Sequence, residues 1–218
     1  MKIYPPAKNV RLTKYPQGNI YQSFGENKPL YNNVCVGTEC LTGGHNGIDI
    51  VLPENTPILG TYGKVVERKD DVGGYGKHVR ILTPRNEQGY AFELIYGHLN
   101  KIDVPLGLVI NDAMQIGLCG NTGFVISGST PYWGDAPAGR GVHLHLGLRV
   151  VKLFDPSDLK WNISYATGDK GTIQNYNNGT FGWIDPMSYF DYSRGLVETP
   201  YLNDVIDYFL VLLNKWKK

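Results

Sequence analysis

The chain has 218 residues, a length that suits one domain able to bury a core without disulfide bonds. Its 21 basic and 20 acidic residues leave a net charge of +1, which gives no reason to expect nucleic acid or an anionic membrane as a partner. No stretch approaches the ~20 apolar residues of a membrane span, and Met1–Pro6 is not followed by the hydrophobic segment of a signal peptide.

Residues 1–44 are rich in Pro, Gly, Asn and Tyr and show little periodicity. We interpret them as an irregular N-terminal arm with room for one edge strand. Cys35 and Cys40 lie five residues apart in this arm, and either a disulfide or two free thiols fits the pattern, with Cys119 left over. The chain has no Cys-x-x-Cys pair, so a zinc site built from thiolates is not expected.

From residue 45 onward, short strands and turns follow one another without intervening helices. Residues 60–67 indicate a turn and a strand, 77–82 alternate polar and apolar side chains, and 90–99, 107–112 and 115–120 indicate further strands. The 27 glycines and 15 tyrosines agree with many strands and turns. We predict an all-β fold, an antiparallel sheet or sandwich-like domain over residues 45–190.

Residues 191–218 form a predicted C-terminal extension with one amphipathic helix at about 202–217. Its apolar residues recur at helical spacing, and three lysines lie at its end. This apolar stripe either packs back on the β domain or forms a contact with a second copy or another partner.

The histidines carry the functional argument. His45 and Asp49 offer a neutral nitrogen and a carboxylate four residues apart, and both atom types bind zinc. His143 and His145 lie in an otherwise apolar segment, so in a strand both imidazoles project from the same face. His98 follows a predicted strand and supplies a third source of imidazole. His78, between Lys77 and Val79, is interpreted as a surface residue.

Three protein ligands leave a tetrahedral zinc ion with one open position, which is the arrangement of catalytic rather than structural zinc sites. Peptide hydrolysis also needs a proton acceptor for the attacking water and a donor for the leaving nitrogen. The sequence supplies enough groups for both tasks, although strand geometry alone does not decide which of His143 and His145 binds the metal.

At these residues the chain resembles the lysostaphin-type zinc endopeptidases, which cleave stem peptides or cross-bridges of peptidoglycan. The likeness runs in the family's order through the segments His45–Asp49, Thr56–Ile58, Gly63–Val65, Gly74–Lys77, Tyr96–Leu99, Ile116–Gly123, His143–His145 and Gly182–Phe190. It implies one zinc ion per chain, held by His45, Asp49 and His145. It also implies that His98 and His143 are the catalytic imidazoles, and that the fold is antiparallel β with a groove across the sheet.

The sequence departs from the family pattern in three ways. Phe124–Val142 is a long insertion where the family usually has a few residues, and we predict that it forms a groove wall in which Tyr132 and Trp133 contact substrate. Many members have a tyrosine about six residues before the first ligand, but Glu39 stands here; Tyr31 or Tyr96 could replace it, or the role could be absent. No separate wall-binding module is evident.

The sequence therefore predicts a zinc endopeptidase that acts on peptidoglycan at the bacterial cell wall. Because no signal peptide is seen, a phage-delivered enzyme and a secreted enzyme without its leader both remain open. The alternatives are a non-catalytic, regulatory relative and a virion component in which zinc only stabilises the fold. Complete retention of all five candidate residues favours the enzyme.

Overall fold

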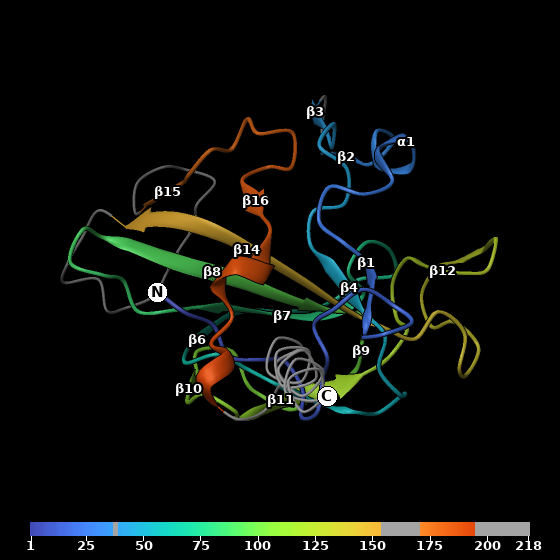
Figure 1. Ribbon diagram of the computed structural model, residues 1–218, viewed down its shortest axis with the longest axis horizontal. Coiled ribbons are helices and arrows are strands. Elements are labelled where there is room, and N and C mark those ends of the chain that lie inside the picture. Colours follow the sequence, from blue (N-terminus) through green and yellow to red (C-terminus); the bar gives the residue numbers. More distant parts are fainter. Residues whose placement is uncertain (37–38, 154–170, 195–218) are drawn as a thin grey trace, which may run out of the picture.

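A computed structural model describes residues 1–36, 39–153 and 171–194, which form an antiparallel β structure (Figure 1). Within these residues the large sheet has nine strands, seven of them in the order β1-β4-β14-β8-β7-β6-β10, with β15 and β16 also pairing with β14. Their bounds are β1 Ile20–Gln22, β4 Ile48–Ile50, β14 Leu144–Leu153, β8 Tyr90–Gly97, β7 Lys77–Leu82, β6 Gly63–Asp70, β10 Val109–Ile110, β15 Gly171–Ile173 and β16 Trp183–Ile184. The all-β prediction is confirmed.

A smaller sheet lies against one face of the large one. It has the order β5-β11-β9, with bounds Pro57–Leu59, Gln115–Cys119 and Leu99–Ile102. Among the described residues, two hairpins complete the β structure: β2 Cys35–Val36 with β3 Glu39–Cys40, and β12 Val125–Ser127 with β13 Thr130–Tyr132. The helical elements of the described residues are short: α1 Lys28–Tyr31, η2 Pro186–Tyr189 and η3 Tyr192–Arg194. None of the described helices is long and apolar enough to cross a membrane.

Strand alternation divides the side chains of β14 and β8 between two environments. Leu144, Leu146 and Leu148 point into the apolar core between the sheets, as do Leu94 and Tyr96. The intervening positions of β14, namely 145, 147 and 149, therefore face the opposite side of the large sheet. That opposite face is the floor of the candidate site.

The N-terminal arm contributes to the core as well as to the sheet. Ile3, Ala7, Val10 and Leu12 are all at most 4% exposed and belong to the main apolar cluster. β1 pairs with β4 at the edge of the large sheet, which confirms the edge strand. Cys35 and Cys40 form a disulfide and Cys119 is free and buried, which resolves the alternative left open by the sequence.

The interpretation of His78 as a surface residue was wrong, because its side chain is 2% exposed: Nδ1 lies 2.8 Å from the carbonyl oxygen of Gly76 and Nε2 lies 3.0 Å from Oε1 of Glu67. Glu67 and Tyr75 cover the polar face of β7 at this point, and strand alternation cannot reveal such cover. The predicted helix at 202–217 lies outside the described residues.

Candidate active site

Pairing between β4 and β14 brings Asp49 and His145 together. The two residues are directly opposite in the register of these strands, and His45 lies in the turn that precedes β4. Gly47 makes this approach possible, since a Cβ atom there would lie 2.6 Å from the carbonyl oxygen of Leu146 and 2.7 Å from the ring of His145. The His-x-Gly-x-Asp spacing therefore reflects close packing as well as chemistry.

Three potential ligand atoms converge at this point. His45 Nε2 lies 3.0 Å from His145 Nδ1 and 3.2 Å from Asp49 Oδ1, and His145 Nδ1 lies 3.1 Å from the same oxygen. All three residues are buried. Ligands 2.0–2.1 Å from a tetrahedral zinc ion would be about 3.3 Å apart, so this triangle fits zinc after a small expansion.

The orientation of His45 supports the same assignment. Its Nδ1 lies 3.3 Å from the carbonyl oxygen of Ser23, so a proton on Nδ1 would leave the Nε2 lone pair directed at the triangle. The corresponding second nitrogen of His145, Nε2, has no hydrogen-bond partner among the described residues. The donor set of two imidazoles and one carboxylate matches a zinc site with an open position.

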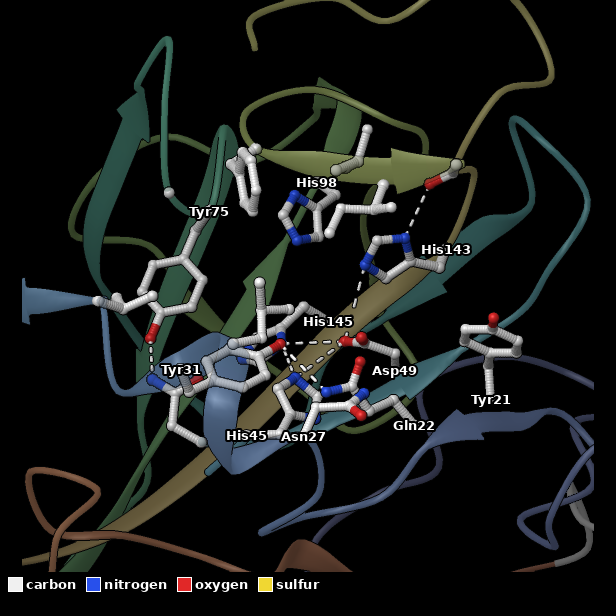
Figure 2. A pocket seen from close by; sticks show the side chains of 18 of the residues that line it. Tyr21, Gln22, Asn27, Tyr31, His45, Asp49, Tyr75, His98, His143 and His145 are labelled. Atoms are coloured by element: carbon white, nitrogen blue, oxygen red, sulfur yellow. Dashed lines mark hydrogen bonds and ion pairs between the residues drawn. The ribbon is translucent and has the colours of Figure 1, made fainter. Parts of the chain in front are cut away.

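His98 and His143 lie beside this triangle, with ring centroids 4.5 Å apart (Figure 2). His98 follows β8 with a positive φ of 59°, and its Nδ1 lies 2.8 Å from the carbonyl oxygen of Thr122. His143 Nδ1 lies 2.8 Å from the carbonyl oxygen of Gly141, and its Nε2 lies 3.6 Å from Asp49 Oδ1. Each ring can donate its Nδ1 proton to the backbone and keep an accepting Nε2.

The protonation of the site suits a cation. Burial raises the pKa of Asp49, but His45, His143 and the hydrogen bond from His145 outweigh it, and the pKa lies well below its usual range. Burial lowers the pKa of His145 to about 4, and burial also holds the pKa of His98 well below its usual range. Near neutral pH Asp49 is therefore a carboxylate and His145 a neutral imidazole, the forms in which these groups bind metal.

The five residues lie in a groove with a volume of about 1150 Å³. One wall comes from the N-terminal arm, where Tyr31 and Leu41 line the groove, and the other comes from the insertion. Within the insertion the lining residues are Phe124–Gly128, Gly139, Gly141 and Val142. Neither Tyr132 nor Trp133 lines the groove. Tyr132 pairs with Val125, and Trp133, which is 62% exposed, packs against Phe124 with ring centroids 5.2 Å apart, so both support the wall from behind. Their contact with substrate stays a prediction.

The two tyrosines proposed from the sequence lie in different places. Tyr96 is fully buried in the core, where its hydroxyl contacts Thr61, so it cannot reach the groove. Tyr31 lines the groove, with its ring centroid 5.2 Å from that of His45, and its hydroxyl accepts a hydrogen bond of 3.3 Å from Gln22 Nε2. Burial, followed by the charge of Asp49, raises the pKa of Tyr31, which keeps its proton available.

Sequence reasoning missed several groove residues: Asn46, Tyr75, Arg80, Arg149 and Trp183. One of them had a readable signal, because Arg149 lies four residues after His145 and strand alternation puts both on the same face. Tyr75 and Asn46 had none, since their contact of 2.6 Å, from Asn46 Nδ2 to the Tyr75 hydroxyl, joins segments 29 residues apart.

A His–Asp–His triangle with two further imidazoles, set in a groove on a β-sheet, defines a site of the metallopeptidase class. The chain belongs to peptidase family M23, a family of zinc metallopeptidases, because the family's sequence profile matches residues 43–156, just over half of the chain. This assignment agrees with the resemblance drawn from the sequence.

Particular relatives are similar over different shares of their length. The peptidoglycan DD-endopeptidase ShyA of Vibrio cholerae is 31% identical over 123 residues, which cover 56% of this chain and 24% of ShyA, so the chain spans about a quarter of that relative. Among solved structures, the catalytic domain of a variant of the prophage-encoded M23 protein EnpA from Enterococcus faecalis is 20% identical, with 83% and 96% coverage and a TM-score of 0.46. The catalytic domain of lysostaphin from Staphylococcus simulans is 20% identical, with 77% and 88% coverage and a TM-score of 0.45.

Proposed function

We propose that this chain is a zinc-dependent endopeptidase that hydrolyses peptide bonds in bacterial peptidoglycan. The observation that carries the proposal is the convergence of His45, Asp49 and His145 within 3.2 Å of one another, with His98 and His143 alongside. Membership of family M23 and the likeness to a peptidoglycan DD-endopeptidase support peptidoglycan as the substrate class.

The three triangle residues would hold one zinc ion per chain. When bound, zinc supplies a Lewis acid that polarises a carbonyl group and lowers the pKa of a water molecule to about 7. Asp49 contributes the only formal negative charge of the triangle, so removal of its carboxylate should weaken metal binding strongly.

His98 and His143 would carry out proton transfer. Both hold Nδ1 against a backbone carbonyl, so Nε2 faces the groove as an acceptor. One imidazole would accept a proton from the attacking water and, once protonated, the same imidazole would deliver that proton to the departing nitrogen. Tyr31 would donate a hydrogen bond from its hydroxyl group to the oxygen that gains negative charge, a role in which one lost donor costs about 10²–10³ in rate.

The enzyme would act at the cell wall, with a stem peptide or a cross-bridge in the groove. The Cys35–Cys40 disulfide supports a location outside the reducing cytoplasm. The proposed contact through the C-terminal helix has no support from the described residues.

Metal content and lysis test the proposal together. Purified protein should contain about one zinc ion per chain by mass spectrometry, and it should reduce the turbidity of purified peptidoglycan. A chelator should abolish lysis, and added zinc should restore it. Zinc binding without cleavage of several wall types would favour the regulatory alternative, whereas absence of metal binding would contradict the proposal.

A further inference from the structure

Two arginine side chains line the groove at a distance from the metal-ligand triangle. Arg149 lies on the same face of β14 as His145, and four residues of strand separate them by about 13 Å. Arg80 on β7 pairs with Ile95 of β8, which in turn pairs with Gly147 of β14, so Arg80 lies two strands across, about 10 Å from Gly147. Neither arginine takes part in the proposed peptide hydrolysis.

A buried carboxylate holds the two guanidinium groups in place. Glu93 is fully buried beneath them and accepts hydrogen bonds of 3.0 and 2.9 Å from Nε and Nη2 of Arg149 and of 3.1 Å from Nη1 of Arg80. The ring of Trp183 packs against Arg149, with the guanidinium carbon 4.7 Å from the ring centroid. These contacts fix the direction of the guanidinium groups before any ligand arrives.

The charges are arranged so that the positive groups face the groove. Arg80 and Arg149 line it, but Glu93 and Glu67, the acidic partners of Arg80, do not. The side chain of Arg80 is 22% exposed, whereas that of Glu93 is fully buried. Burial raises the pKa of the Tyr75 hydroxyl overall. Among the charges near it, Arg80 and Arg149 lower this pKa and Glu93 raises it, and each arginine has a larger effect than Glu93.

The other end of the groove carries the opposite charge. β4 runs antiparallel to β14, so the chain beyond Ile50 leads away from Arg149, and Glu54 lines the groove there. Its carboxylate accepts hydrogen bonds from Asn100 Nδ2 at 3.0 Å and from the backbone nitrogen of Gly139 at 3.1 Å. A peptide lying along the groove would therefore meet two guanidinium groups toward one end and the carboxylate of Glu54 toward the other.

We infer that Arg80, supported by Arg149 and Glu93, forms a subsite for a carboxylate of the peptide substrate. The inference rests on the proposed endopeptidase function and adds a chemical requirement to it. An extended peptide covers 3.3–3.6 Å per residue, so the recognised carboxylate would lie roughly three to four residues from the bond that is cut. It could be the C-terminal carboxylate of a stem peptide or an acidic side chain within it.

Three synthetic cross-linked stem peptides distinguish these sources: one with all carboxylates free, one amidated only at the C-terminus, and one amidated only at side chains. Zinc-loaded wild-type protein should cleave the free peptide about tenfold or more faster, in kcat/KM, than one of the amidated forms, mainly through KM. Arg80→Gln should reduce this preference to nearly one. Arg68→Gln changes an exposed arginine on neighbouring β6, outside the groove, and should leave the preference unchanged.

Equilibrium binding of the same peptides, measured by calorimetry, keeps the test independent of turnover. If no peptide is cut but the free form binds about tenfold more tightly than an amidated form, the endopeptidase proposal fails and the subsite stands. Equal cleavage and equal binding of all three forms by the wild-type protein would overturn the subsite. A preference that persists in folded Arg80→Gln protein would overturn it too.

Discussion

Gly47 lies directly against the ring of His145, so closely that a Cβ atom on residue 47 would approach both ring atoms Cε1 and Nε2 to 2.7 Å. This contact sets the imidazole of His145 against the backbone of the segment that carries His45 and Asp49, the other two residues of the candidate metal site. The geometry of the triangle thus depends on a residue that has no side chain.

Gly47→Ala should weaken zinc binding, because the added methyl group must displace the ring of His145. Disturbance of the residues that orient a ligand typically costs 10–100-fold in metal affinity. Competition with a fluorescent zinc chelator would measure the loss. Gly73→Ala is the matched control, since an added Cβ there meets no atom within 4 Å, and it should bind zinc like the wild type.

Substitution of four of the five site residues should separate metal binding from catalysis. Asp49→Ala and His145→Ala should lose zinc and activity together. His98→Ala and His143→Ala should keep about one zinc per chain and lose about 10²–10⁴ in kcat, the usual contribution of general acid–base catalysis. Metal analysis beside a lysis assay provides both readouts, and loss of zinc from His98→Ala would show that the ligands are misassigned.

The pairing between Glu67 and His78 predicts a specific response to acid. The hydrogen bond from His78, followed by Arg80, lowers the pKa of Glu67 to about 2 against the opposing effect of burial. Because the folded-state pKa is depressed, the stabilisation is fully present above the unfolded-state value of about 4.3 and is lost as the pH falls toward 2. Glu67 is 35% exposed, so solvent screening limits the effect to about 1 kcal/mol.

Glu67→Gln should therefore be less stable than the wild type at pH 7, with the difference shrinking by pH 2.5. Urea unfolding at several pH values would measure it. Glu87→Gln, at an exposed turn position, should have the same free energy of unfolding as the wild type at every pH. A difference for Glu67→Gln that is constant with pH would contradict the assigned cause.

The insertion hairpin should govern specificity more than stability. Val125 and Tyr132 face each other in the β12–β13 pair, so replacing residues 126–131 with Gly–Gly keeps the last pair and removes Ile126, Ser127 and Gly128 from the groove wall. We expect a melting temperature close to that of the wild type and an altered ratio of cleavage rates between two wall types. An unchanged ratio would count against a wall function.

The cysteines should differ sharply in their reactivity. Cys35 and Cys40 are joined, and burial raises the pKa of the Cys119 thiol to about 12, which leaves almost no reactive thiolate at neutral pH. Iodoacetamide should label none of them in the native protein and two after mild reduction, as counted by mass spectrometry. Val34 and Leu41 flank the disulfide and line the groove, so reduction should also raise KM.

The alternation of side chains along a strand correctly predicted which residues of one strand share a face. Period-two alternation put His143 and His145 on one face, and both indeed lie within 3.6 Å of Asp49 Oδ1. The metal-ligand triangle followed from the resemblance, because nothing in the spacing places residue 45 beside residue 145. His78 and the Arg80–Glu93–Arg149 cluster escaped because their burial depends on cover from other strands, which alternation within one strand cannot report.

The packing of the arm has a practical consequence for protein engineering. A truncated chain that starts at His45 would lack Ile3, Val10 and Leu12, each worth about 1.5–3 kcal/mol when buried, and would uncover the apolar surface that they protect. It would also lose Tyr31 and the pairing of β1 with the strand that carries Asp49. A fusion of this chain to a targeting module should therefore keep residues 1–44 attached.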